Sequence, residues 1–179
     1  MKSDVGDSEL YAIREWYAYN TFVRKRYLGF LHTLPRNVIS KDRGASYSSI
    51  LDIFTHVLDV YRFWLEGYYE TGEGSKPLGH LALKEVAKEE EKLDVYLSKL
   101  LSRLTPADLK SPFNLIVAEG KRKRKSKAML ENVLWHLVGE DLQHRGEINA
   151  LLYQEGVDPP ITTWCYWKGV RDRAELEHV

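Results

Sequence analysis

The chain has 179 residues, of which 44% are hydrophobic and 29% are charged, as in an ordinary globular protein with its own core. Its 26 basic residues balance its 26 acidic residues, so no net charge draws it to nucleic acid or to an anionic membrane. The single cysteine, Cys165, excludes an internal disulfide framework, and no apolar run approaches the roughly 20 residues of a membrane span. We therefore expect one cytoplasmic domain over residues 1–179, without a membrane anchor or a signal peptide.

Four long segments have the apolar periodicity of amphipathic helices. They cover residues 8–34, 47–71, 79–104 and 127–155. Pro35 stops the first segment, and Gly156, with two prolines just beyond it, stops the fourth. No alternating apolar run is long enough to anchor a sheet. The pattern predicts an all-α protein built as an antiparallel four-helix bundle.

The connection over residues 105–126 is irregular. It contains a short β-like stretch at 114–117, and we expect it to be an irregular or hairpin-like segment before the last long helix. A basic run from Lys121 to Lys127 follows, which can be interpreted as an anion or nucleic-acid patch. We favour a solvated loop or hairpin arm, because the rest of the chain is not basic and no aromatic residue interrupts the run to stack on bases. The aromatic tail after residue 160 predicts an anchor followed by a short helix or a frayed end.

Three ionisable residues occupy positions where a helical stripe should be apolar. His56 lies in the middle of the second helix, and Glu140 and His144 lie one turn apart in the fourth. Burying such groups without partners is costly, so they must pair with one another, pair with nearby arginines, or hold a divalent metal ion. Spacing alone leaves these alternatives open. His136 lies about 12 Å along the helix axis from His144, so we expect it beside the site and not as a ligand.

Three segments also resemble a known family. SYSSILDIFTHVLDVYRFWLEG (46–67) and HLVGEDLQHRGEINALLYQEGVDPP (136–160) resemble the two signature regions of the DinB/YfiT-like family, and YNTFVRKRYLGFL (19–31) resembles its opening helix. The similarity spans roughly residues 8–165. It implies a four-helix bundle with a divalent metal at one end of the core. The family's ligands are typically one histidine from the second helix and an H-x-x-x-H pair from the fourth, which His56 and His144 match.

Glu140 departs from this pattern, because it stands where the family has the first histidine of the pair. Two histidines and one carboxylate are a recognised ligand set for catalytic zinc or iron. We therefore expect one divalent ion (zinc, nickel or iron) held by His56, Glu140 and His144. The competing hypothesis is that the metal has been lost and that Glu140 pairs directly with one of the histidines.

The resemblance also implies an activity. Family members include thiol-dependent transferases and hydrolases, so we expect a metal-dependent enzyme that acts on a small molecule, with a low-molecular-weight thiol as a candidate cofactor. Facing alone suggests the residues around the site: Trp16, Tyr17, Asn20, Asp59, His136 and Arg145. Asp52 or Asp59 could orient His56. The alternative from another class is a non-catalytic bundle, without the metal, that forms a homodimer or binds a partner.

Overall fold

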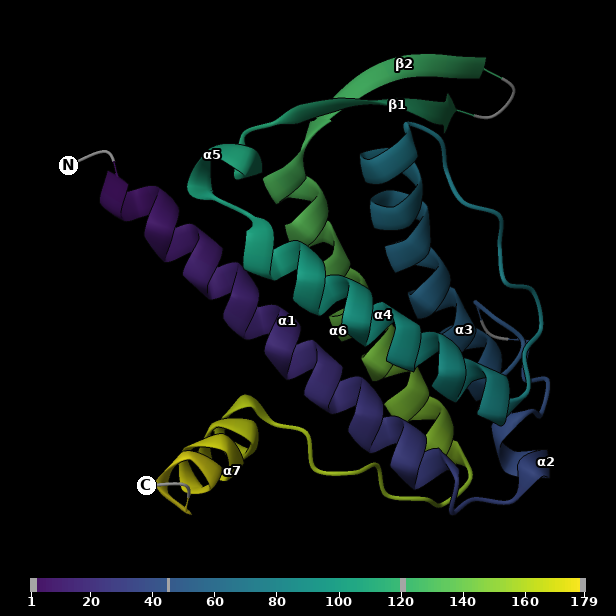
Figure 1. The fold of residues 1–179 in the computed structure, drawn as a ribbon. Coiled ribbons are helices and arrows are strands. Elements are labelled where there is room, and N and C mark those ends of the chain that lie inside the picture. The colour runs from purple at the N-terminus through teal and green to yellow at the C-terminus, as the bar shows by residue number, and fades with distance from the viewer. Residues whose placement is uncertain (1–2, 45, 120–121, 178–179) are drawn as a thin grey trace.

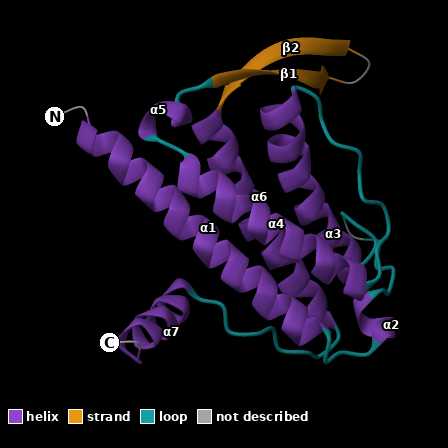
Figure 2. Cartoon of the chain, in the orientation of Figure 1, coloured by secondary structure: helices purple, strands orange, loops and turns teal. Residues whose placement is uncertain are grey.

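The computed structural model describes residues 3–44, 46–119 and 122–177, and helices dominate it (Figures 1 and 2). The long helices are α1 (Ser3–Leu31), α3 (Ile50–Tyr61), α4 (Leu83–Arg103) and α6 (Leu130–Gln154). The shorter elements are α2 (Arg36–Ile39), α5 (Pro106–Leu109), β1 (Pro112–Glu119), β2 (Arg122–Met129) and α7 (Trp164–Glu177). A π-helical segment, η1 (Arg62–Tyr69), continues α3. Among the described residues, no helix is both long enough and apolar enough to cross a membrane.

The long helices form a closed ring. Helix α1 contacts α4 and α6, and α3 contacts the same two helices, so each long helix packs between two others (Figure 1). The predicted all-α bundle is confirmed, with helix boundaries within a few residues of those expected from periodicity. This arrangement brings the middle of α3 against the middle of α6, which are the two segments that carry the candidate site.

Local chemistry sets the helix ends. Helix α3 begins three residues later than predicted because Ser49 caps it, its Oγ accepting a hydrogen bond of 3.2 Å from the backbone N–H of Asp52. Helix α6 ends at Gln154 because Gly156 takes a left-handed conformation, with φ of 71°. The next N–H, of Val157, then donates to the carbonyl of Leu152 at 3.0 Å and closes the helix end.

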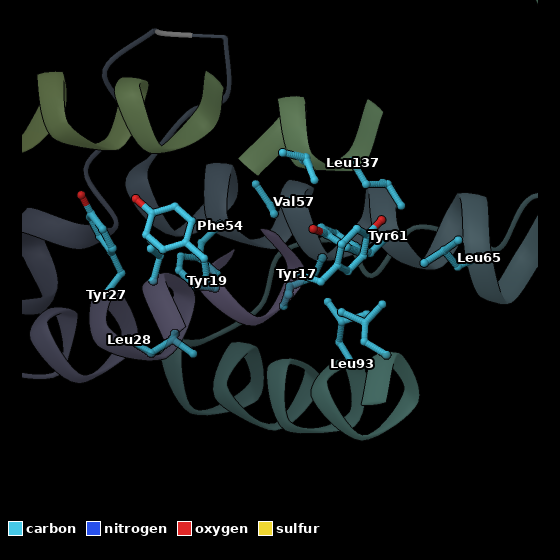
Figure 3. Close-up of a cluster of buried hydrophobic side chains, with 14 of the residues drawn as sticks. Tyr17, Tyr19, Tyr27, Leu28, Phe54, Val57, Tyr61, Leu65, Leu93 and Leu137 are labelled. Carbon is cyan, nitrogen blue, oxygen red and sulfur yellow. The ribbon is translucent and has the colours of Figure 1, made fainter. Parts of the chain in front are cut away.

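The core lies between the four long helices (Figure 3). At its centre the rings of Tyr17 from α1 and Tyr61 from α3 meet edge to face, with centroids 5.9 Å apart. Leu93 from α4 and Leu137 from α6 are buried on either side of this pair. The Tyr17 hydroxyl donates to the carbonyl of Leu134 at 3.0 Å, so a polar atom at the centre is paired.

An arginine is buried in the same core. Arg24 is only 3% exposed, and its guanidinium reaches Glu90 of α4 at 2.9 Å and Asp141 of α6 at 2.8 Å. Tyr61 of α3 donates its hydroxyl to the same Asp141 oxygen. Burial raises the pKa of Glu90 to about 7, although Arg24 acts in the opposite direction. One network of charged and polar groups therefore joins all four long helices.

The connection before α6 is a hairpin, in agreement with the hairpin-like segment that was expected there, but its strands are longer than the β-like stretch predicted at 114–117. Residues 112–119 and 122–129 form an antiparallel hairpin, in which Pro112 pairs with Met129. Phe113 and Leu115 of β1 turn toward the bundle, where the Phe113 ring meets Tyr69 of η1. Strand β2 escaped prediction because it consists mainly of lysine and arginine, which have low strand propensity. Of the basic run, Lys121 lies outside the described residues, whereas the side chains of Arg124, Lys125 and Lys127 are exposed.

The tail is more regular than expected. Its aromatic residues do not precede a short helix but begin α7 itself, which packs along α1. Trp164 lies with its ring 4.7 Å from that of Trp16, and Trp167 lies 5.6 Å from Tyr19. Trp16 therefore contacts the C-terminal helix rather than the predicted site.

We expect Arg24→Met to lower the free energy of unfolding by about 3–5 kcal/mol, because it leaves Glu90 and Asp141 buried without a counter-charge. The neighbouring Lys25→Met removes the same charge from an exposed pair with Asp94 and should cost less than about 1 kcal/mol. Urea denaturation of both variants measures the difference. Equal losses in the two variants would show that the buried network does not hold the bundle together.

Candidate metal centre

Three donor groups converge where α3 packs on α6. His56 comes from α3, and Glu140 and His144 come from successive turns of α6. Their ligand atoms all lie within 4.8 Å of one another. Glu140 Oε2 lies between the imidazoles, 3.2 Å from His144 Nε2 and 3.8 Å from His56 Nε2. The structure therefore brings together the three residues that the sequence singled out.

The chemistry of this donor set fits a divalent ion. Bonds from zinc to imidazole nitrogen and carboxylate oxygen are about 2.0–2.2 Å long, so neighbouring donors on one ion are separated by about 3–3.5 Å. The two distances from Glu140 Oε2 are close to that range. The i, i+4 spacing places Glu140 and His144 on one face of α6, and the contact between helices supplies His56 from the other side.

His144 is held from behind. Its Nδ1 lies 2.9 Å from Glu147 Oε2, and that carboxylate also accepts a 2.8 Å hydrogen bond from the Ser46 hydroxyl. An imidazole whose Nδ1–H donates to a carboxylate has its Nε2 lone pair free to ligate, which is the usual arrangement around a metal-bound histidine. Burial raises the pKa of Glu147, but its hydrogen bonds to His144 and Ser46 outweigh this and lower it, which keeps the carboxylate charged.

His56 is positioned by stacking. The ring of Tyr47 lies over that of His56, with centroids 4.1 Å apart and planes at 23°. Burial lowers the pKa of His56, and the nearby His144 lowers it further. His56 is therefore neutral at neutral pH, as a metal ligand must be. Tyr47, Ser46 and Glu147 were not predicted; only Glu147 left a signal, since it lies three residues after His144 on a helix.

Two protonation states satisfy the contacts of His144. If its ring is neutral with the proton on Nδ1, towards Glu147, then Nε2 and the Glu140 carboxylate face each other with lone pairs at 3.2 Å, and a cation between them would satisfy both. If its ring carries two protons, it donates to Glu140 and to Glu147 without a metal. These states correspond to the metal site and to its metal-free alternative, and metal content distinguishes them.

A cavity of about 520 Å³ opens beside the triad, and His56 and Glu140 form part of its wall. Such a volume suits a small organic molecule. Asp59 and His136, both expected near the site, line this cavity, and His136 Nε2 lies 3.5 Å from Glu140 Oε1. Burial raises the pKa of Asp59. His80 also lines the cavity, and its Nδ1 lies 2.7 Å from Asp52.

The other expected neighbours lie elsewhere. Asn20 and Tyr17 are buried in the core around Tyr61, and neither lines the cavity. Arg145 turns away from the triad, and its guanidinium donates to the Tyr19 hydroxyl at 2.7 Å. Facing along a single helix could not distinguish these positions, because the neighbouring helix determines whether an inward side chain meets the core or the cavity.

Known proteins support this picture of the fold. A sequence model of the DinB family matches residues 4–170. A crystal structure of a DinB-like protein from Bacillus cereus ATCC 10987 is similar over 84% of this chain and 95% of that one, with a TM-score of 0.65 and 18% sequence identity. At that identity the likeness shows the fold alone. No curated protein sequence matches.

The lowered pKa of His56 predicts how stability depends on pH in metal-free protein. Below about pH 6.5 the unfolded chain takes up a proton at His56 more readily than the folded chain, so the histidine costs folding free energy as the pH falls. His56→Gln removes this titration. The unfolding free energy of the wild type minus that of the variant should therefore be constant above about pH 7.5 and decrease towards pH 5.5. Denaturant titrations with chelator present measure it, and a flat or rising difference would contradict the lowered pKa.

Proposed function

The chain belongs to the DinB family, and we propose that it is an enzyme that uses one divalent metal ion to act on a small molecule. His56, Glu140 and His144 would hold the ion. The observation that carries the proposal is the convergence of these donors, from two helices, in the wall of a cavity large enough for a substrate.

A bound divalent ion supplies Lewis-acid chemistry, since it polarises an oxygen of the substrate or makes a thiol more acidic. The carboxylate makes the site harder than three imidazoles would, which suits zinc or iron as well as nickel. The family resemblance favours a thiol-dependent transfer or a hydrolysis, with a low-molecular-weight thiol as co-substrate in the first case.

Residues of the chain would take the remaining tasks. His136 reaches into the cavity from α6, one turn before Glu140, and its Nε2 can accept a proton from a bound molecule or return one. Glu147 keeps the proton of His144 on Nδ1, and Tyr47 fixes the plane of the His56 ring. Phe63 and Trp64 line the cavity and would give an apolar part of the substrate a surface to pack against.

Elemental analysis of protein purified without chelator tests the metal. We expect about one equivalent in the wild type and loss of the metal in His56→Ala, Glu140→Ala and His144→Ala. His136→Ala is the matched control, because His136 contacts the same carboxylate but lies outside the triad and should retain metal. A wild type without metal under metal-replete expression, or a His56→Ala variant that keeps it, would refute the proposal in favour of the metal-free pairing.

The carboxylate behind His144 gives a second test. Glu147→Gln should weaken metal binding by about 10–100-fold, because the variant no longer holds the proton of His144 on Nδ1 with a charged acceptor. Glu155→Gln makes the same charge change at a carboxylate that pairs with Lys41, and it should leave affinity unchanged. Competition with a chromogenic chelator measures both. Equal affinities in the two variants would contradict the supporting role of Glu147.

A further inference from the structure

The cavity beside the triad runs along one face of α3 and of η1, which continues α3 without a break. Asp52, His56 and Asp59 of α3 and Phe63 of η1 all line it, and they recur at intervals of three to four residues. At about 1.5 Å of rise per residue, Phe63 lies roughly 10 Å along the axis from His56. A molecule in the cavity would therefore extend from the triad past Asp59 to the ring of Phe63.

The far end of the cavity has aromatic walls. Phe63 and Trp64 meet edge to face, with ring centroids 5.4 Å apart, and Trp64 lies 5.8 Å from the ring of His136. Ser75 and Pro77, from the loop after η1, also line the cavity. Gly67 lets that loop approach, since a Cβ at this position would lie 2.5 Å from the backbone nitrogen of Ser75. The aromatic pocket is thus fixed by backbone packing.

The charge of the lining has one sign. Among the described residues, the lining includes the carboxylates Asp52, Asp59 and Glu140 but no lysine or arginine. A ligand that carried a carboxylate or phosphate towards Asp59 would meet a like charge, with no lysine or arginine in the described lining to offset it. An organic cation would meet two kinds of attraction there, to a carboxylate and to the faces of aromatic rings.

The carboxylates of the lining differ in their remaining capacity to accept hydrogen bonds. Asp52 uses both oxygens, one towards the Ser49 hydroxyl and one towards His80. The two contacts of Asp59, from the Leu78 N–H at 2.8 Å and from Arg62 at 3.6 Å, both involve Oδ1. Arg62 is also shared with Glu66, so one positive charge serves two carboxylates. Asp59 is therefore the acceptor best able to take a further donor from the cavity.

On the basis of the function proposed above, we propose that the substrate is a small organic amine. Its cationic nitrogen is held by Asp59, its apolar body lies against Phe63 and Trp64, and its reacting group faces the triad. Asp59 follows His56 by one helical turn, about 5 Å of rise, which separates the amine from the reacting group by a few bonds.

Calorimetric titration with matched probes tests this assignment. Phenethylamine, 2-phenylethanol and 3-phenylpropionate share an apolar body and differ in charge. We expect the amine to bind at least about tenfold more tightly than the alcohol, and the carboxylate to bind most weakly to metal-free protein. Because Asp59, Phe63 and Trp64 are not members of the triad, the preference for the amine should persist with chelator present. The preference for the amine and the metal site can therefore each be confirmed or refuted independently of the other.

Variants identify the acceptor. Asp59→Asn keeps an oxygen for the Leu78 N–H but should abolish most of the preference for the amine. Asp94→Asn makes the same change at a carboxylate that pairs with Lys25 and lies outside the lining, and should preserve the preference. Trp64→Leu should weaken the binding of the amine and of the alcohol alike, because it removes an aromatic ring that both would contact. Equal binding of amine and alcohol to the wild type, or equal effects of Asp59→Asn and Asp94→Asn, would overturn the proposal.

Discussion

The buried guanidinium of Arg24 is the constraint on which the arrangement of the bundle depends. A charge in a core must be matched there, and Arg24 of α1 is matched by Glu90 of α4 and Asp141 of α6. Tyr61 joins Asp141 from α3. Hydrophobic contacts tolerate small rotations of a helix about its axis, whereas these directional contacts do not. The network therefore fixes which face each long helix turns inward.

The geometry of the candidate site depends on the same network. Asp141 follows Glu140 directly, so a rotation of α6 that moved Glu140 away from His56 would also break the contact of Asp141 with Arg24. Tyr61 plays the same part for α3, five residues after His56. The candidate ligands are thus held by helices whose orientation is set elsewhere, and local contacts from Glu147 and Tyr47 position only the two histidine rings. This division explains how a site can stand ready for a metal ion without strain in its own backbone.

Sequence periodicity was sufficient for the bundle and for the facing of the three candidate ligands, because a polar residue in an apolar stripe is visible without coordinates. It was insufficient wherever the partner lies far along the chain. In the sequence, Arg24 is indistinguishable from an ordinary surface arginine of a helix, because its partner Asp141 lies far along the chain. Trp16 was expected at the site because its contact with Trp164 of α7 could not be foreseen. Strand β2 was hidden by its own composition, since its pairing depends on backbone groups that the side chains do not reveal.

The long separation between Arg24 and Asp141 also bears on how the protein is made. The two residues are 117 positions apart, so a ribosome adding about 5–20 residues per second needs on the order of ten seconds to produce the second after the first. Throughout that interval α1 has no partner in α6, and Arg24 has at most one of its two carboxylate partners, Glu90, within reach. The bundle cannot close around it until the last long helix emerges. Closure of the bundle therefore comes late in synthesis, and the triad, with two of its members on α6, cannot form before it.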